Sequence, residues 1–319
     1  MAPGGKGILL LNLGGPDTLG AVRPFLYNLF SDRDIIRLGP SLLQKPIAWL
    51  ISVTRAPKTR SYYKLIGGGS PIAKITGAQA EALQNRLSDC GVRVYVGMRY
   101  WSPFISDAIE RIRGDGIEEC LALSLYPHYS IATTGSAYSE VRRCVERHPM
   151  RLVFADPWVD NSVYVAAVAN TIEKAADQPG GRLNLLYSAH SLPQSFIDQG
   201  DPYVQHIVGT VERVDAELKR RGFSVHSSIS YQSRSGPVKW LEPSTEEVIE
   251  EMGRRGAGDV VVVPISFVSD HIETLYEVDI LYRELAANHG LRLRRAESLN
   301  INPDFIDALA DVALKSGFR

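Results

Sequence analysis

The sequence is poor in cysteine. Its 319 residues include only Cys90, Cys120 and Cys144, and none of these belongs to a CxxC pair. A closed zinc site of paired cysteines is therefore excluded, and so is a framework of several disulfides. We expect the three thiols to be buried or idle in a reducing compartment.

An excess of charge of either sign is also missing. The chain has 35 basic and 36 acidic residues, a formal net charge of -1. This balance argues against a nucleic-acid partner and against a polybasic membrane anchor. No apolar run approaches the roughly 18 residues that span a bilayer, and the N-terminus lacks a signal-peptide pattern. We therefore expect a soluble, cytoplasmic protein.

The glycine-rich stretches lack the fingerprints of phosphate-binding loops. LNLGGPDTLG contains no GxGxxG, and IGGGSPI contains no GxxxxGK followed by Ser or Thr. Pro16 and Pro71 closely follow these glycines and remove backbone N–H groups that a phosphate cradle would use. Turns are the expected role of both stretches.

Short runs rich in Val, Ile and Leu alternate with stretches of helical period. Several runs, such as VVVVPISF, are apolar without alternation, which is typical of strands buried on both faces. Alternating strands and helices predict parallel sheets covered by helices. The predicted strands are Gly7–Leu13, Val92–Met98, Cys120–Leu125, Leu152–Ala155, Leu183–Ala189, Val225–Ser230, Val260–Phe267 and Leu291–Arg294.

The eight strands divide four and four, with a boundary near Asp156–Asp160. We predict an α/β protein of two similar Rossmann-like lobes, residues 1–156 and 157–319, each with a four-stranded parallel sheet. A C-terminal amphipathic helix is expected at about 303–316, with Asn302 as its N-cap.

One histidine lies where α/β proteins bind ligands. The predicted strand Leu183–Ala189 delivers His190 at its carboxyl end. A structural histidine bonded to nearby backbone is the alternative, and the position alone does not choose between them. A serine hydrolase is disfavoured because Ser188 lacks the GxSxG elbow.

The segment FVSDHIETLYEVD carries a run of acids after the most apolar strand. On a regular helix, Asp270, Glu273 and Glu277 share one face, either lining a cleft or forming a solvated surface. His271 and Glu273 should diverge by roughly 200°. We therefore predict that Glu273 binds a metal together with His190, a pair with open positions that suits transient Fe²⁺.

Aromatic residues and arginines cluster after other strands. Such faces suit a large, flat ligand that carries carboxylates, although packing between lobes is the alternative for each residue. The residues are Arg99, Tyr100 and Trp101; Tyr126, His128, Tyr129 and Ser130; and Arg234 and Trp240.

The segment 38–53 is apolar and interrupted by Pro40 and Pro46. Packing in the core is one interpretation. The other is a mobile lip over a cleft that touches a membrane holding an apolar substrate, which would give a peripheral membrane contact.

Nearly the whole chain resembles the ferrochelatase family. The resemblance implies two lobes with a porphyrin in the cleft between them, and insertion of Fe²⁺ into protoporphyrin IX to give protoheme at the end of heme synthesis. The matching segments, in the family's order, are LNLGGP, LFSDRDII, YKLIGGGSPI, GMRYWSPF, LYPHYSIATTGS, YSAHSLP, GDPY, YQSRSGPVKWLEP and FVSDHIETLYE.

The resemblance also assigns residues. It makes His190 and Glu273 the groups that contact the metal or the pyrrole protons, and it leaves open which of these His190 does. Asp270, His271 and Glu277 become a track for protons or iron. The positions that match porphyrin contacts are Leu13, Arg99, Tyr100, Ser130 and Trp240.

The chain departs from animal members at their iron–sulfur cluster. Those members use a cysteine in the segment matching Tyr129–Thr133 and a C-terminal cysteine group. Here that position is Ile131, and no cysteine follows Cys144. We predict no cluster and no tightly bound cofactor. The alternatives are a coproporphyrin III ferrochelatase, which LNLGGP and the apolar 38–53 segment disfavour, a cobalt chelatase and a porphyrin carrier.

Overall fold

The structure is a computed structural model that describes residues 5–146, 150–176 and 181–319. The N-terminal segment is expected to lack a signal peptide, and its residues 1–4 lie outside the described residues. The chain forms two compact units. The first comprises Met1–Tyr126, Ser130–Pro157 and Leu309–Arg319, and the second comprises Pro127–Tyr129 and Trp158–Ala308.

The first unit is built on a four-stranded parallel sheet in the order β2-β1-β3-β4. Its central strand carries four successive leucine and isoleucine side chains that are completely buried, Ile8 to Leu11. Burial on both faces explains why the run lacks alternation. The strands are β1 (Gly5–Asn12), β2 (Val92–Met98), β3 (Ile117–Ser124) and β4 (Arg151–Phe154).

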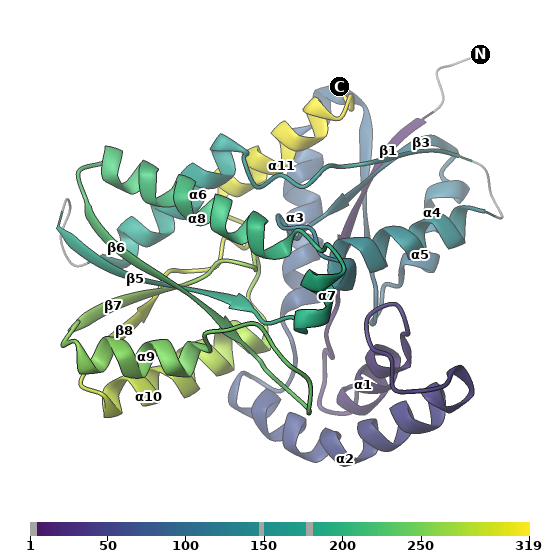
Figure 1. Cartoon of the computed structure of the whole chain (residues 1–319). Helices are drawn as coiled ribbons and strands as arrows, with labels where there is room; N and C mark the ends of the chain where they lie inside the picture. Colours follow the sequence, from purple (N-terminus) through teal and green to yellow (C-terminus); the bar gives the residue numbers. More distant parts are fainter. Residues whose placement is uncertain (1–4, 147–149, 177–180) are drawn as a thin grey trace. The chain divides into compact units, whose positions relative to one another are not determined.

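Helices cover this sheet on both faces (Figure 1). Helices α4 and α5 pack on the face that carries Leu9 and Leu11, and α3 lies on the other side of β1. The helical elements are α1 (Val22–Ser31), a 3₁₀ turn (Ser41–Leu43), α2 (Gln44–Leu65), α3 (Ile72–Arg86), a 3₁₀ turn (Ser88–Cys90), α4 (Ile105–Gly114), a π-helical turn (Ile131–Gly135) and α5 (Ser136–Val145).

The second unit repeats the plan with the order β6-β5-β7-β8, again parallel. Figure 1 shows α6 and α8 over one face of this sheet and α9 and α10 over the other. The elements are β5 (Arg182–His190), β6 (Ser224–Gln232), β7 (Asp259–Pro264), β8 (Arg292–Arg295), α6 (Ser162–Ala175), α7 (Gln194–Asp198), α8 (Tyr203–Arg220), α9 (Thr245–Arg254), a π-helix (Glu273–Tyr282) and α10 (Arg283–Asn288). Helix α11 (Pro303–Lys315) begins in the second unit and ends in the first.

The predicted fold class is confirmed. Each of the eight predicted strands is present; β2 has the predicted bounds, and the other seven differ at one or both ends by a few residues. Helix α11 matches the predicted C-terminal helix, and the Asn302 side-chain oxygen accepts the Asp304 N–H at 2.9 Å, as an N-cap does. The element after β7 differs from the expected regular helix because residues 273–282 are π-helical.

Most of the large apolar side chains of the 38–53 segment do not pack into the core of its unit, although Ala48 is buried there. The segment forms the 3₁₀ turn and the start of α2, where Leu42, Trp49 and Leu50 are 88%, 52% and 56% exposed. Single exposed apolar residues are common, but several gathered on one short segment mark a contact surface. Among the residues that the structure describes, no helix is long and apolar enough to cross a membrane.

Candidate active site

His190 is the last residue of β5 and is held there by its backbone. Its N–H donates to the Ser266 hydroxyl at 2.9 Å, and the Tyr203 hydroxyl donates to its carbonyl at 3.0 Å. Both partners come from other elements of the second unit. They fix the histidine at the carboxyl edge of the sheet, where parallel α/β proteins bind ligands.

The imidazole of His190 contacts the carboxylate of Glu273. Its Nδ1–H donates to Oε2 at 2.8 Å, and the two side chains are 37% and 17% exposed. Because the bond uses Nδ1, the Nε2 nitrogen is available to a ligand or a proton. The pair predicted from two distant segments is therefore assembled.

Two residues at the end of β6 join the carboxylates of Glu273 and Glu277. The Ser233 hydroxyl lies 2.9 Å from Glu273 and 2.6 Å from Glu277, and Gln232 Nε2 lies 3.3 and 3.4 Å from them. Ser233 has φ +67°, a left-handed conformation that a serine adopts only at a cost. A single hydroxyl proton serves one carboxylate at a time, and the Gln232 amide supplies further N–H donors to the same two carboxylates.

Burial and neighbouring charges separate the pKa values of these groups. Burial works to lower the pKa of His190, but the charge and hydrogen bond of Glu273, with the charge of Glu277, raise it above its usual range. Burial works to raise the pKa of Glu273, but His190 and His271 outweigh it and hold that pKa well below its usual range. Burial and the charge of Glu273 raise the pKa of Glu277 to about 8. The pKa values of the two carboxylates are thus shifted in opposite directions, Glu273 downward and Glu277 upward. Such a separation is typical of proton-transfer sites.

The prediction that His271 and Glu273 diverge is wrong. His271 Nε2 lies 3.8 Å from Glu273 Oε1. The reason is that His271 precedes the helix, so the angular spacing of a regular helix does not apply. The ring Nδ1–H donates to the Ser269 carbonyl at 3.0 Å, which leaves Nε2 buried without a hydrogen-bond partner among the described residues.

Asp270 does not share a face with the two glutamates, as a regular helix would require. Its carboxylate accepts hydrogen bonds from Arg295 at 2.9 Å, Ser298 at 2.8 Å, Asn300 at 2.9 Å and Thr274 at 3.1 Å. Of the three acids expected to share one helix face, only Glu273 and Glu277 do so. The reason is that the helix begins at Ile272, after Asp270, and continues with the wider π turn.

Trp240 pairs with the segment that directly follows His190 at the end of β5. It bridges Pro193 in an antiparallel pair, and the Leu241 N–H donates to the Leu192 carbonyl at 3.0 Å. The indole is partly exposed, and its Nε1 is buried without a hydrogen-bond partner within the described part of the chain.

In the first unit, two of the predicted contacts follow β1 and β2 directly. The Tyr100 N–H donates to the Leu13 carbonyl at 2.9 Å, and Leu13 and Arg99 line the same small cavity. The Arg99 guanidinium is paired with Asp32 at 2.6 Å and Glu140 at 3.6 Å. These partners already satisfy much of its donor capacity.

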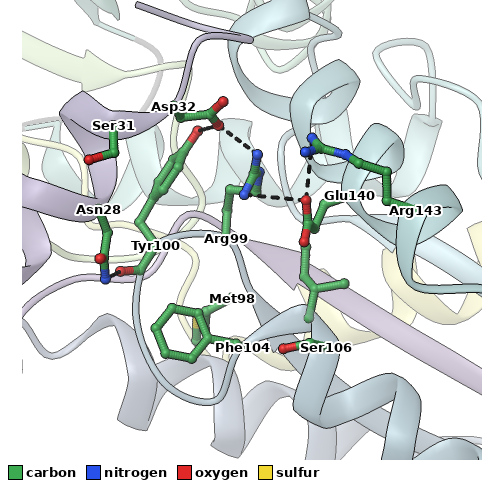
Figure 2. A pocket seen from close by; sticks show the side chains of 11 residues that line it. Asn28, Ser31, Asp32, Met98, Arg99, Tyr100, Phe104, Ser106, Glu140 and Arg143 are labelled. Atoms are coloured by element: carbon green, nitrogen blue, oxygen red, sulfur yellow. Dashed lines mark hydrogen bonds and ion pairs between the residues drawn. The ribbon is translucent and has the colours of Figure 1, made fainter. Parts of the chain in front are cut away.

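Tyr100 and Ser130 are buried within the first unit. The Tyr100 hydroxyl donates to Asp32 at 2.6 Å, beside a cavity of about 340 Å³ (Figure 2). Ser130 caps the π-helical turn that follows it, accepting the Ala132 N–H at 3.1 Å. Both residues belong to the first unit, whereas His190 and Glu273 belong to the second.

A model of the ferrochelatase family matches residues 5–316. The chain belongs to the ferrochelatase family. Ferrochelatase of Geotalea uraniireducens is 50% identical over 314 residues, covering 97% of each chain. Ferrochelatase of Desulfotalea psychrophila is 47% identical over 314 residues, with the same coverage.

Solved chelatase structures share the fold of this ferrochelatase family member. SirB from Bacillus subtilis with Fe³⁺ has a TM-score of 0.59 at 13% identity, covering 98% of this chain and 95% of that one. CbiX, described as the terminal enzyme of siroheme biosynthesis in denitrifying bacteria, has a TM-score of 0.52 at 12% identity, covering 98% of each chain.

Sequence reasoning missed several residues of this ferrochelatase site. Gln232 and Ser233 lie in YQSRSG, a matching family segment, yet they received no role. Their position directly after a predicted strand was the available signal. Asp32, which accepts hydrogen bonds from Arg99 and Tyr100, lies in LFSDRDII and had no such signal because no predicted strand ends directly before it. No group of three His, Cys, Asp or Glu side chains suited to a metal ion is present in the described ranges.

Proposed function

We propose that this member of the ferrochelatase family inserts Fe²⁺ into protoporphyrin IX, releasing two pyrrole protons, with His190 as the proton acceptor and Glu273 as its partner. The chain is a metal-chelating lyase by family, and Fe²⁺ is its substrate. The observation that supports the assignment of residues is the 2.8 Å contact between His190 and Glu273 at the carboxyl edge of β5.

His190 is suited to accept protons because of how Glu273 holds it. The carboxylate fixes the ring through Nδ1 and favours the imidazolium that forms when Nε2 takes a proton. Metalation also requires that the flat macrocycle turn a nitrogen lone pair toward the ion. Binding of a bent porphyrin, supported by contacts remote from the metal, would provide this.

The protons would leave His190 through the carboxylates. The Ser233 hydroxyl lies 2.9 Å from Glu273 and 2.6 Å from Glu277. It can accept a proton from one carboxylate while it donates its own proton to the other. The raised pKa of Glu277 suits a group that holds a proton near neutral pH and then releases it. Of the other two residues predicted for the track, His271 lies 3.8 Å from Glu273 and would extend it, whereas the Asp270 carboxylate is occupied by protein donors and would not carry protons.

Fe²⁺ would meet an imidazole and a carboxylate before it reaches the ring. His271 Nε2 and Glu273 Oε1, 3.8 Å apart, could take the ion between them, and the reverse assignment, with His190 as a metal ligand, uses the same carboxylate. Imidazole and carboxylate donors both suit Fe²⁺. Two protein ligands leave positions open for transfer.

Porphyrin contacts are proposed at Leu13, Arg99, Tyr100, Ser130 and Trp240. Trp240 and Leu13 offer apolar surface to the macrocycle. Arg99 would bind a propionate only by sharing its donors with Asp32 and Glu140.

We propose that no iron–sulfur cluster is bound. Such a cluster commonly takes four protein ligands, and the chain contains three cysteines. They lie on three separate elements, the 3₁₀ turn at Ser88–Cys90, β3 and α5, and Cys120 is buried.

The exposed lip at 38–53 is proposed to make a peripheral membrane contact. Leu42, Trp49 and Leu50 present apolar surface, and the Arg23 guanidinium lies 5.6 Å from the Trp49 ring centroid. Apolar side chains beside a cation suit a bilayer interface. Co-sedimentation with liposomes tests this: Leu42→Ser with Leu50→Ser should abolish binding, and unchanged binding would reject the contact.

Anaerobic incubation with Fe²⁺ and a porphyrin, followed by absorption spectroscopy, tests the function. Protoporphyrin IX should be metalated faster than coproporphyrin III. Faster metalation of coproporphyrin III would show that coproporphyrin III, and not protoporphyrin IX, is the preferred substrate. Insertion of Co²⁺ into an earlier tetrapyrrole, without insertion of Fe²⁺, would indicate a cobalt chelatase. Porphyrin binding without any metalation would indicate a carrier.

A further inference from the structure

Arg295, the last residue of β8, lies between two carboxylates that bracket the acidic segment. Its Nη1 donates to Asp270 at 2.9 Å, and its Nε and Nη2 donate to the two oxygens of Asp279 at 3.0 and 2.9 Å. The arginine side chain is 11% exposed, against 19% for Asp270 and 23% for Asp279. Glu273 and Glu277 both lie within the stretch that these two aspartates delimit.

The Asp270 end is held from both its backbone and its side chain. The Asp270 N–H donates to Asn300 Oδ1 at 2.9 Å, and Asn300 Nδ2 donates back to the Asp270 carboxylate at 2.9 Å. Asn300 has φ +44°, in the left-handed region where asparagine is better tolerated than most residues. With Arg295, Ser298 and Thr274 also donating, this carboxylate is saturated by protein donors.

Thr274 connects Asp270 to the backbone next to Glu273. The buried Thr274 hydroxyl lies 3.1 Å from the Asp270 carboxylate and accepts the His271 N–H at 3.0 Å. The backbone on both sides of Glu273 is thereby tied to Asp270. The contacts of Asp270 therefore constrain the backbone that carries Glu273, the glutamate that contacts His190.

The Asp279 end lies within the π-helix, after Glu277. There Arg295 makes two parallel hydrogen bonds to one carboxylate, a geometry that guanidinium provides and ammonium does not. A lysine at this position could not make all three contacts together. The guanidinium of Arg295 thus joins Asp270, which precedes the helix, to Asp279 within the π-helix.

We propose that Arg295 is a positioning residue: with Asp270 and Asp279 it forms a clamp that fixes the π-helix so that Glu273 and Glu277 converge on His190 and Ser233. In this clamp Asp270 serves as an anchor and not as a member of the proton or iron track. The catalytic consequence of the clamp rests on the proposed function.

The variant that tests the clamp is Arg295→Gln, with Arg283→Gln as the matched control. Arg283 also pairs with Asp279, at 3.3 Å, but it is 57% exposed and has no contact with Asp270. We expect Arg295→Gln to lower kcat for iron insertion by about tenfold or more, since misplacing a reacting group by about 1 Å costs on the order of 100-fold. KM for protoporphyrin should stay within about twofold, and Arg283→Gln should match the wild type.

A second readout does not depend on turnover. The ¹⁵N signals of the His190 ring report its contact with Glu273 and are assigned by their loss in His190→Ala. They should shift in Arg295→Gln and stay unchanged in Arg283→Gln. If the wild type proves to have no chelatase activity, the proposed function fails, and these signals still test the clamp.

Several results would overturn the clamp. These are a normal kcat in Arg295→Gln, unshifted His190 signals in that variant, or the same loss of kcat in Arg283→Gln. If Arg295→Gln does not fold, Arg295→Lys keeps the charge but loses the fork. A lysine variant with wild-type kcat and unshifted His190 signals would equally reject it.

Discussion

Replacing Glu277 by glutamine should stabilise the protein, and increasingly so as the pH rises. Burial and the charge of Glu273 raise the pKa of Glu277 from 4.5 to about 8. Between these values the unfolded chain gives up a proton that the folded chain retains, so the free energy of unfolding of the wild type falls as the pH rises. Glutamine keeps the shape and removes the titration.

The size of the effect follows from the two pKa values. At about 1.36 kcal/mol per pH unit, the full penalty above pH 8 is roughly 5 kcal/mol. Because the Glu277 side chain is only partly buried, solvent screening reduces this to about 2–3 kcal/mol. The gain from Glu277→Gln should therefore be near zero at pH 5 and reach about 2–3 kcal/mol at pH 8.

Urea unfolding of both proteins at several pH values between 5 and 8.5 measures this difference. Glu250→Gln, which changes an exposed glutamate on α9, is the control and should leave the pH dependence unchanged. A difference between Glu277→Gln and the wild type that is constant across the pH range, or that shrinks as the pH rises, would refute the raised pKa.

Other substitutions give equally direct expectations. His190→Ala should lower iron insertion by about 100-fold or more while porphyrin still binds, and near-normal turnover would contradict its role. Trp240→Ala should raise KM for porphyrin with little change in kcat, because stacking surface is lost; an unchanged KM would count against the contact. Tyr100→Phe should destabilise the protein by about 1–3 kcal/mol in thermal or urea unfolding, because it removes one of the two donors that lie 2.6 Å from the Asp32 carboxylate.

The strands could be predicted from the sequence because both sheets are covered on both faces. Burial on both faces favours largely apolar runs in the inner strands β1, β3, β5 and β7. The predicted runs at the sheet edges are less buried, as RLRR of β8 shows, but they also became strands. The placement of His190 followed from the same logic, since a polar residue after such a run must lie at the sheet edge. Pairing it with Glu273 needed only that both follow strands of one parallel sheet.

The geometry around Asp270 could not be predicted in this way. The expected common face assumed a regular helix, whereas the helix starts at Ile272 and is π-helical from Glu273. No local pattern in the sequence distinguishes the two kinds of helix. The partners that hold Asp270, Arg295 and Asn300, come from a strand end and a loop more than twenty residues away.

The matching strand orders of the two sheets show how unevenly a repeated scaffold can be used. His190 ends the first strand of the second sheet, and Asn12 ends the equivalent strand of the first. Asn12 is buried and bonded to Thr76 and Tyr126, so that copy of the strand end carries no titratable group. The proposed proton acceptor His190 thus has no counterpart at the equivalent strand end of the first sheet, where a buried amide takes its place.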